Sequence, residues 1–444
     1  MISLGCAKNQ VDAEVMLRLL EEDGYQITGD PAEADIICIN TCGFIDSAKQ
    51  EAIDTILEMA GYKEHGRCKG LIVTGCLAER YPEEIAAQLP EADAIIGISG
   101  YGKICDAVET LLSEKEKDEE PKYVFHEKDY SLSYLDAGRK LTTPKSYAYL
   151  KIAEGCSNRC AYCAIPAIRG PFRSRTPEAV LREAKTLAIN GVKELVVVAQ
   201  DTTRYGTDLS EDGSSLLPQL IAGLDEIPGI ERVRLLYLYP DEITDEIIEA
   251  IKNSKKTVHY VDLPLQHISD SVLERMNRRG GGRLIREVLR KFRKAIPDCI
   301  IRTSLITGFP GETEEEHEEL KNFLLSEKLD RVGIFQYSKE EGTKAARLKP
   351  QIPKRIKEKR YRELMEVQRK ISHEKNIARV GRIYDVIVDG FSEDGLFYTG
   401  RSYAEAPDSD GVIYFAAKDE LNAGDIVPVK ILVAEEYDLT GEQV

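Results

Sequence analysis

The sequence predicts a mixed α/β protein in three parts: an N-terminal parallel-sheet α/β domain, a central partial (β/α) barrel and a small C-terminal antiparallel β-barrel. Two observations favour this fold class. Short apolar runs alternate with helical patterns over the first three quarters of the chain, which is typical of parallel sheets covered by helices. After Gly381 the pattern changes to short alternating strands separated by Gly and Asp turns, as in a small barrel.

The composition describes a globular chain without a membrane segment. Its 444 residues are enough for about three domains of roughly 150 residues each. No apolar run approaches the roughly 18 residues of a membrane helix, and the N-terminus lacks a basic region followed by an apolar signal segment. We therefore expect a cytoplasmic protein with no membrane partner.

Ten cysteines and a net charge of -17 restrict the function further. Without export signals, cysteines in a chain of this size are expected to be reduced thiols or metal ligands rather than disulfides. The pI of about 5.1 argues against an overall electrostatic attraction to nucleic acid and favours a cationic partner.

Residues 1–113 form the predicted N-terminal domain, in which strand-like runs alternate with helical patterns. The expected strands are Ile2–Leu4, Ile36–Ile39, Leu71–Thr74 and Ala94–Ile96, and the expected helices lie near 11–23, 46–60, 79–88 and 101–112. Only five residues precede Cys6, so the first strand is expected to be short.

Three cysteines of this domain, Cys6, Cys42 and Cys76, follow successive strands, each beside a glycine. Because ligands gather beyond the carboxyl ends of parallel strands, the three thiols are expected to converge at one sheet edge and hold a metal cluster. The alternative is that they are small buried hydrophobes, since free cysteine is among the most buried residue types. The other cysteines outside the central motif are interpreted as structural: Cys38, Cys68, Cys105 and Cys299.

Residues 114–139 are predicted as a linker because they are charged and have little apolar periodicity. Residues 140–352 then contain six βα units, fewer than the eight of a closed barrel. The expected strands are Tyr147–Ile152, Glu194–Ala199, Val233–Tyr239, Val258–Leu263, Ile300–Thr307 and Arg331–Tyr337. The helical patterns lie near 177–190, 215–226, 243–253, 269–278, 283–295 and 313–327.

The stretch Glu154–Cys163 carries the strongest chemical signal. Its cysteines, Cys156, Cys160 and Cys163, are spaced to hold three corners of a cubane iron-sulfur cluster and leave the fourth iron open to chelate a small molecule. A structural zinc site is the alternative, but it needs four ligands, and the nearest other Cys or His is His126. The motif follows the first barrel strand, where barrel active sites are expected.

Polar or glycine-bearing strand ends of the central segment are candidates for holding the nucleoside and methionine parts of a cofactor. They are Gln200–Thr203, Tyr237–Pro240, Gln266–His267 and Thr307–Glu312. Each has a structural alternative, such as a hydrogen-bonded histidine or tyrosines that pack at the rim. The guanidinium groups that follow the motif suit carboxylate or phosphate recognition, or structural pairing with nearby acids: Arg169, Arg173 and Arg175.

CxxxCxxC after a barrel strand, with the aromatic Tyr162 before the last cysteine, resembles the radical S-adenosylmethionine superfamily. Together with the upstream cysteines, it makes the chain similar to the methylthiotransferases over essentially its whole length. The resemblance implies a barrel of radical S-adenosylmethionine type and two [4Fe-4S] clusters. A radical cluster would lie on Cys156, Cys160 and Cys163, and an auxiliary cluster on Cys6, Cys42 and Cys76.

The resemblance also implies the cofactor and the reaction. Tyr162, Gln200 and Gly308 are expected to contact S-adenosylmethionine. One S-adenosylmethionine supplies a methyl group to sulfur at the auxiliary cluster, and a second is cleaved to a 5'-deoxyadenosyl radical that removes a hydrogen from the substrate. A radical is needed because an unactivated C–H bond offers no acidic proton to a general base. An electron donor is an implied partner.

Two segments resemble the branch of the family that modifies a ribosomal-protein aspartate. After Cys6 the chain reads Ala-Lys-Asn-Gln, whereas the branch that modifies tRNA adenosine tends to carry Gln-Met-Asn there. Gln200–Thr203 also fits, because the tRNA enzymes tend toward Gln-Asn-Val-Asn. The implied substrate atom is the β-carbon of an aspartate in the basic small-subunit ribosomal protein (protein twelve) of the decoding centre, free or in the subunit.

The last segment contains a connecting helix at 353–379 and the small barrel at 380–444. Leu364, Val367 and Ile371 form a narrow apolar stripe that is expected to lie along the central barrel. The terminal barrel resembles the TRAM module, an RNA-binding barrel of the tRNA-modifying relatives.

The segment from Lys375 to Val444, however, contains six Lys/Arg and fourteen Asp/Glu, a net charge of 6 - 14 = -8. This charge favours a basic protein over a nucleic acid as the partner. The acidic stretch Glu405–Gly411 also resembles the ribosomal-protein branch. Two alternatives stay open: methylthiolation of tRNA, and a non-catalytic, metal-stabilised RNA-binding protein.

Overall fold

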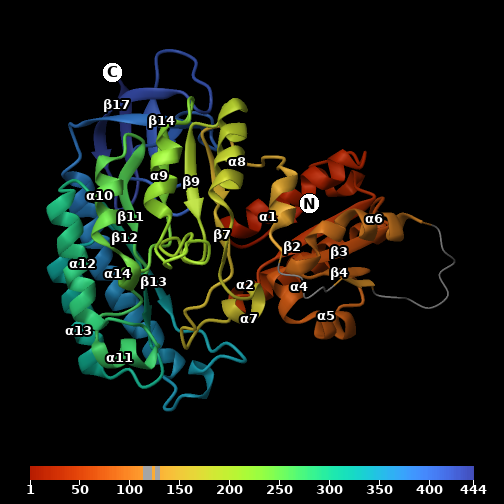
Figure 1. The fold of residues 1–444 in the computed structure, drawn as a ribbon, viewed down its shortest axis with the longest axis horizontal. Helices are drawn as coiled ribbons and strands as arrows, with labels where there is room; N and C mark the ends of the chain where they lie inside the picture. Colours follow the sequence, from red (N-terminus) through yellow and green to blue (C-terminus); the bar gives the residue numbers. More distant parts are fainter. Residues whose placement is uncertain (114–122, 126–130) are drawn as a thin grey trace.

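The computed structural model describes residues 1–113, 123–125 and 131–444, and the side chains of all of these except 123–125. Figure 1 shows three parts. The N-terminal domain, in red and orange, lies beside the amino-terminal half of the central barrel, and the small C-terminal barrel, in dark blue, caps one end of the central barrel. The mixed α/β class predicted from the sequence is confirmed.

The N-terminal domain is a five-stranded parallel sheet between two helical layers, with strands in the order β1-β2-β3-β4-β5. Its strands are β1 (Ile2–Ser3), β2 (Ile36–Thr41), β3 (Gly70–Gly75), β4 (Ala94–Ile96) and β5 (Tyr123–Phe125). Its helices are α1 (Ala7–Glu22), α2 (Asp46–Ala60), α3 (Tyr62–His65), α4 (Cys76–Arg80), α5 (Pro82–Gln88) and α6 (Ile104–Leu112), with short 3-10 turns at Pro31–Glu33 and Ile98–Lys103.

Successive side chains of the strands point to opposite faces of this sheet, and each face is covered by different helices. Cys38 and Ile72 pack with α1 and α6 on one face, while their neighbours Ile39 and Val73 pack with α2 and α5 on the other. Cys38 and Cys68 are buried, as their structural interpretation requires. Loops at the carboxyl ends of the strands are therefore left at one edge of the sheet.

The segment predicted as a linker, 114–139, contains a strand. β5 pairs in parallel with β4, from Ala94 opposite Tyr123 to Ile96 opposite Phe125, and a 3-10 turn follows at Ser133–Ala137. The sequence pattern did not indicate β5 because three residues between charged runs are too short to show a period of two. Residues 114–122 and 126–130 of the predicted linker lie outside the described residues.

The central domain is an open parallel sheet of six strands in the order β13-β12-β11-β10-β9-β6, as predicted for a partial barrel. The strands are β6 (Tyr147–Lys151), β9 (Glu194–Val198), β10 (Arg232–Leu235), β11 (Thr257–Asp262), β12 (Ile300–Thr307) and β13 (Arg331–Gln336). The helices are α7 (Ile165–Arg169), α8 (Pro177–Ile189), α9 (Leu217–Asp225), α10 (Asp245–Asn253), α11 (Asp270–Arg275), α12 (Gly281–Ala295) and α13 (Glu314–Glu327). Two 3-10 turns, Pro240–Glu242 and Ala345–Arg347, and a two-stranded ribbon, β7 (Ala153–Glu154) with β8 (Arg173–Ser174), complete it.

Local sequence explains several boundaries of this domain. Helix α13 begins with a capping box in which Thr313 and Glu316 satisfy each other's backbone N–H groups. Strand β10 was expected to continue to Tyr239 but ends at Leu235, because Tyr237 has a left-handed φ of 62° that breaks the strand. Helix α14 (Lys354–Ile377) lies along the barrel and buries Leu364 and Ile371, as its apolar stripe predicts.

The C-terminal domain is a closed barrel with strands in the order β14-β15-β16-β18-β17. Its strands are β14 (Ile383–Phe391), β15 (Tyr398–Arg401), β16 (Ile413–Ala416), β17 (Ile426–Ala434) and β18 (Leu439–Gln443). Four of its pairings are antiparallel as predicted, but β16 and β18 are parallel. The final strand β18 was not predicted, because its residues Leu-Thr-Gly-Glu-Gln are mostly polar.

The described part of the chain contains no helix with the length and apolar character needed to cross a bilayer.

Candidate functional site

The loop after β7 carries Cys156, Cys160 and Cys163 at the carboxyl end of the barrel's first strand. Two contacts fold the loop back on itself. The Cys156 N–H donates to the Gly170 carbonyl at 3.1 Å, and Gly155 has a φ of 77° at a place where a Cβ would lie 2.1 Å from the Pro171 carbonyl oxygen. Only glycine fits there. The loop is tied to the next elements because the Ala161 N–H donates to the Met276 carbonyl at 2.8 Å.

The three thiols of this loop influence one another. Burial, followed by the charge of Cys160, raises the pKa of Cys163, and burial chiefly raises the pKa of Cys156 to about 11. Cys156 and Cys163 therefore hold their protons at neutral pH until a metal displaces them.

Cys160 has two donors of its own. The Tyr239 hydroxyl lies 3.5 Å from Cys160 Sγ and the Arg278 Nη1 lies 3.9 Å from it. Burial and then the charge of Cys160 raise the pKa of Tyr239, so its hydroxyl stays protonated and can donate. The Arg278 guanidinium also stacks over the Tyr239 ring at 4.1 Å. Together these groups place two hydrogen-bond donors at the Cys160 sulfur.

The three residues predicted to contact S-adenosylmethionine lie in or near this loop and come from different elements. Tyr162 lies within the loop and packs against a small cluster that includes Phe309. The Gln200 side chain, at the end of β9, donates to Glu154 Oε1 at 2.7 Å, while its own Oε1 is buried and has no hydrogen-bond partner among the described residues. A Cβ on Gly308, which follows β12, would meet Lys357 of α14 at 2.2 Å. All three stay predictions, and the orphaned oxygen of Gln200 is the contact point best suited to a cofactor.

The second triad lies at the carboxyl edge of the N-terminal sheet. Thr41 pairs with Gly75 across β2 and β3, which places Cys42 and Cys76 side by side one residue later. Cys6 caps the amino end of α1. A Cβ on Gly5, whose φ is 95°, would lie 2.8 Å from Cys42 Cβ, so the loops of Cys6 and Cys42 touch only because this residue is glycine.

The three thiols of this triad have different electrostatic surroundings. Burial raises the pKa of Cys76 to about 12 and also raises the pKa of Cys42. At Cys6 burial acts in the same direction, but the charges of Lys8 and Arg169 and two backbone N–H groups outweigh it and lower the pKa. Cys6 lies in a crowded site yet remains exposed to solvent, and its lowered pKa at a helix amino end favours binding of a metal.

One buried arginine joins the two triads. Arg169, at the end of α7, lies 3.5 Å from Cys76 Sγ and donates to the Asn9 carboxamide oxygen. Its other nitrogen contacts Glu154 at 2.8 Å and Asp12 at 3.1 Å. Because Glu154 precedes the Cys156 loop and Asn9 follows Cys6, a single guanidinium contacts the walls of both thiol sites.

Three further candidates, Arg169, Arg175 and His267, make hydrogen bonds or ion pairs within the protein. Arg169 and Arg175 pair with acids inside the protein, Arg175 with Glu183 and, at 3.4 Å, with Asp136. His267 is fully buried and accepts a hydrogen bond from the Ser269 N–H at 3.1 Å. Sequence reasoning missed two contacts of the thiol sites: that of Arg278 with Cys160 and that of Asn9 with Arg169.

The donor sets fit iron-sulfur clusters. Each site offers three thiols, backbone or guanidinium donors to sulfur, and glycines that let backbone approach closely. Within residues 1–113 and 131–444, no three Cys, His, Asp or Glu side chains converge on a single point that would hold one ion. A cubane gives each thiolate its own iron atom, so it does not require such convergence.

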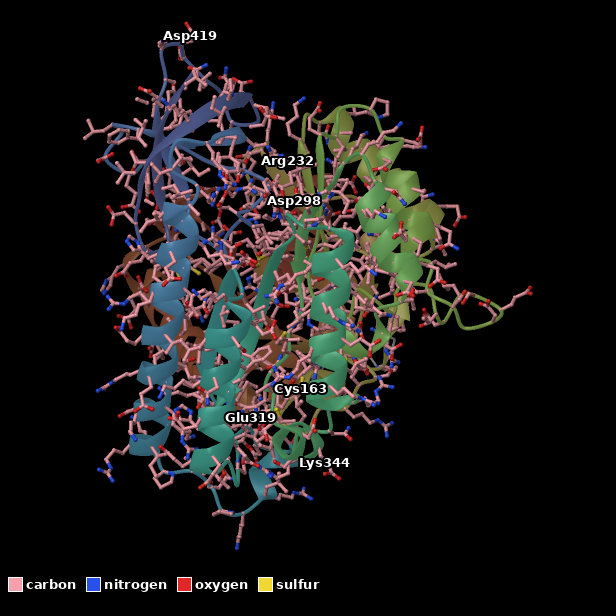
Figure 2. All side chains as sticks on the ribbon, turned by 90° about the vertical axis from the view of Figure 1, so that its left-hand side faces the viewer. Cys163, Arg232, Asp298, Glu319, Lys344 and Asp419 are labelled. Atoms are coloured by element: carbon pink, nitrogen blue, oxygen red, sulfur yellow. The ribbon has the colours of Figure 1, made fainter. Side chains whose placement is uncertain are left out.

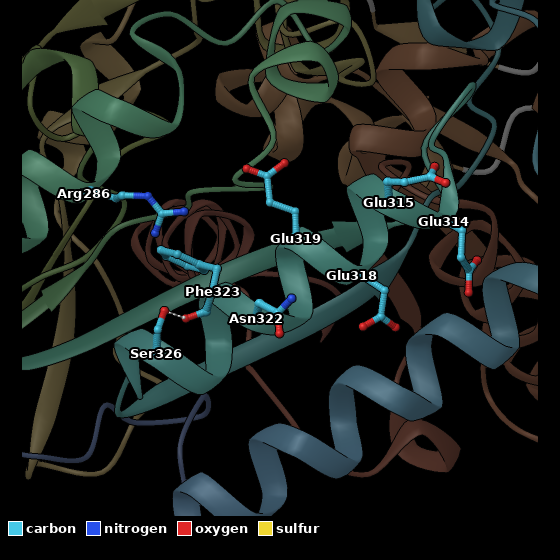
Figure 3. A pocket seen from close by; sticks show the side chains of 8 residues that line it. All are labelled: Arg286, Glu314, Glu315, Glu318, Glu319, Asn322, Phe323 and Ser326. Carbon is cyan, nitrogen blue, oxygen red and sulfur yellow. Dashed lines mark hydrogen bonds between the residues drawn. The ribbon is translucent and has the colours of Figure 1, made fainter.

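A surface groove of about 690 Å³ lies on the outer side of the barrel between α12 and α13 (Figure 3). Its wall is formed by acids of α13 and by the face of Phe323, over which Arg286 stacks at 5.2 Å. The acids are Glu314, Glu315, Glu318 and Glu319. No thiol of either triad lines this groove, so we do not assign the chemistry to it.

Family models match all three parts of the chain. Residues 150–324 match the radical SAM superfamily, residues 1–97 match Uncharacterized protein family UPF0004, and residues 380–444 match the TRAM domain.

Several curated proteins are similar over nearly the full length. "Ribosomal protein uS12 methylthiotransferase RimO" of Acetivibrio thermocellus is 51% identical over 442 residues, which is 99% of this chain and 97% of that protein. The proteins of the same name from Clostridium tetani and Thermoanaerobacter sp. are each 51% identical, over 99% of this chain and 96% and 98% of theirs.

Among solved structures, the radical S-adenosylmethionine methyltransferase TsrM from Kitasatospora setae, with tryptophan substrate and a cofactor analogue bound, has a TM-score of 0.52 at 13% identity. It covers 74% of this chain and 70% of that one. At this identity the likeness extends to the fold only.

Proposed function

Because this chain belongs to the ribosomal protein uS12 methylthiotransferases of the radical S-adenosylmethionine superfamily, we propose that it transfers a methylthio group to the β-carbon of an aspartate in ribosomal protein uS12. The superfamily uses a [4Fe-4S] cluster and S-adenosylmethionine, and the enzyme is a transferase. We place its action in the cytoplasm, where ribosomal proteins are assembled, with a one-electron donor protein as a further partner.

The Cys156, Cys160 and Cys163 loop is proposed to hold the radical cluster, and Cys6, Cys42 and Cys76 an auxiliary [4Fe-4S] cluster. When bound, the radical cluster supplies the electron that cleaves S-adenosylmethionine, which allows attack on an unactivated C–H bond. Tyr162, Gln200 and Gly308 are proposed to hold S-adenosylmethionine beside it. The donors to Cys160 and Cys76 described above would hydrogen-bond the sulfur atoms of the bound ligands.

The observation that carries this proposal is that one guanidinium, Arg169, contacts both Cys76 of the second triad and Glu154, two residues before Cys156. A carbon-centred radical must meet its sulfur before it reacts elsewhere, so both sites belong beside one substrate chamber. The acidic C-terminal segment, with six Lys/Arg against fourteen Asp/Glu, supports a basic protein as the substrate rather than an RNA.

The test is a comparison of two substrates. Anaerobically reconstituted enzyme, given dithionite and S-adenosylmethionine, is incubated separately with uS12 and with unmodified tRNA, and both products are weighed by mass spectrometry. We expect a methylthio group on one aspartate of uS12 and unchanged tRNA, with no product from the Cys160→Ala variant. Modified tRNA beside unmodified uS12 would favour the tRNA reaction. Absence of S-adenosylmethionine cleavage would favour a non-catalytic RNA-binding protein.

A further inference from the structure

A cavity of about 530 Å³ opens where the three parts of the protein meet. The start of α1, strand β6, the end of β10 and one loop of the C-terminal barrel all reach it. Its lining includes Cys6, Gln10, Tyr147, Tyr149, Tyr237 and Asp408. This volume lies within the roughly 300–1,000 Å³ range of small-ligand pockets, so the cavity admits a short peptide segment and not a folded domain.

The carboxylate of Asp408 is held in place on the wall of this cavity. A single oxygen, Oδ2, accepts hydrogen bonds from the Tyr149 hydroxyl at 2.7 Å and the Tyr147 hydroxyl at 2.9 Å. The two rings pack edge to face with centroids 5.6 Å apart. Burial and then the charge of Asp408 raise the pKa of both tyrosines, so their hydroxyls remain donors. Because both donors use Oδ2, Oδ1 is left to accept a further hydrogen bond.

Asp408 differs from the other acids of its loop because no described Lys, Arg or His side chain forms an ion pair with it. Glu405 is buried between Arg331 and Arg379. Asp410 accepts from the Tyr260 hydroxyl at 2.7 Å and lies 3.7 Å from Arg302. For Asp408, by contrast, no Lys, Arg or His partner is found in the part of the chain that the structure describes. Its carboxylate therefore lines the cavity without a direct ion pair among the described residues.

We propose that this cavity is the recognition site for the substrate segment and that Asp408 binds a Lys or Arg side chain close to the target aspartate. A carboxylate fixed by two hydroxyls is a prepared acceptor for a charge-assisted hydrogen bond. Cys6 also lines this cavity, so a segment that reaches the auxiliary triad can place its neighbouring residues against Asp408. The Asp408 carboxylate repels a phosphate group, which favours a peptide over an RNA backbone at this site.

This inference rests on the proposed function, and it identifies how the substrate is selected. The perturbation is Asp408→Asn, which keeps an oxygen acceptor for the two tyrosine hydroxyls and removes the charge. Asp419→Asn is the matched control, because Asp419 is an exposed acid of the same barrel that lies at its outer tip (Figure 2). Thermal midpoints of both variants should equal that of the unaltered protein.

Binding of labelled uS12 to the reconstituted enzyme is measured by fluorescence anisotropy, with the KM and kcat of methylthiolation alongside. Loss of one charged hydrogen bond predicts a roughly 10- to 100-fold increase in Kd and KM for Asp408→Asn, a smaller change in kcat, and no change for Asp419→Asn. Each Lys or Arg of uS12 is then replaced in turn by Gln. One of these substitutions should weaken binding to the unaltered enzyme and leave the Kd for the Asp408→Asn enzyme unchanged.

Two results would overturn the inference while leaving the proposed function intact. The first is equal Kd values for the unaltered enzyme and Asp408→Asn. The second is weaker binding by Asp408→Asn that no Lys→Gln or Arg→Gln substitution in uS12 reproduces with the unaltered enzyme. Tighter binding of an RNA oligonucleotide by Asp408→Asn, without a change in uS12 binding, would assign the cavity to nucleic acid. Failure of the unaltered enzyme to bind or modify uS12 would instead refute the proposed function itself.

Discussion

Arg169→Met is predicted to destabilise the contact between the N-terminal domain and the barrel. Arg169 is 2% exposed, and it shares a buried cluster with Lys151, Asp12 and Glu154. Lys151 contacts both acids, with 2.6 Å to Asp12. Two cations thus balance two carboxylates, and methionine of similar length removes one cation while retaining most of the packing. Lys151 then faces both carboxylates alone, so one buried negative charge is left without a balancing cation.

Breaking a buried ion pair in this way costs about 3–5 kcal/mol. For a domain of this size that loss lowers the thermal midpoint by roughly 6–20 °C, measured by calorimetry on the metal-free protein. Arg182→Met is the control, because Arg182 is 67% exposed in a weak surface pair and should shift the midpoint little.

Glu154 supplies a sharper test of the same reasoning. Although burial opposes it, the charges of Arg169 and Lys151 lower the pKa of Glu154. A depressed pKa stabilises the fold above the unfolded value of about 4.3, and that contribution is lost as the pH falls toward the folded value.

The double variant Arg169→Met/Glu154→Gln leaves Lys151 opposite Asp12 and should be more stable than Arg169→Met alone, with a coupling energy of about 1–3 kcal/mol. If the loss in free energy of unfolding of the double variant equals the sum of the losses of the two single variants, the charge-balance argument is refuted.

Three further predictions concern the metal sites and the barrel. Cys42→Ala should reduce iron from about eight to about four atoms per chain and retain S-adenosylmethionine cleavage, whereas Cys160→Ala should lose the same iron and the cleavage; full iron in either would contradict the assignment. Gly5→Ala, whose Cβ would lie 2.8 Å from Cys42 Cβ, should lose only the auxiliary cluster signal in electron paramagnetic resonance. Despite burial, the charges of Arg379 and Arg331 lower the pKa of Glu405 to about 2. Glu405→Gln should therefore lower the free energy of unfolding by on the order of 3 kcal/mol at neutral pH. That difference should shrink from about pH 4.3 toward pH 2, and a constant difference would show that the charge of Glu405 is unimportant.

The parts of the fold that the sequence predicted are those that local patterns encode. The central strands are five or more residues of buried apolar character in most cases, such as β9 with Val196 and Val197, and their order follows from parallel βα connection. Cys6, Cys42 and Cys76 were found because each follows a predicted strand, and Cys156, Cys160 and Cys163 because of their spacing. Short or polar strands, such as β5 and β18, carry too little periodicity to be recognised.

The contacts within the site could not be predicted because they join distant positions. Arg169 and Asp12 are 157 residues apart in the chain, and Tyr147 and Asp408 are 261 apart. Helix and strand patterns relate residues two to four positions apart, so no local signal pairs such side chains. The sequence indicated that Arg169 suits a carboxylate, but only the packing of α7 against α4 determines that its partners are internal.

The central claim, that this enzyme removes hydrogen from the β-carbon of a uS12 aspartate, is tested most directly with isotope. uS12 carrying deuterium at the β-carbons of its aspartates is treated with the reconstituted enzyme, and 5'-deoxyadenosine is analysed by mass spectrometry beside the protein. We predict deuterium in 5'-deoxyadenosine and a methylthio group on one aspartate, both absent with Cys160→Ala. A methylthiolated aspartate accompanied by deuterium-free 5'-deoxyadenosine would contradict the claim.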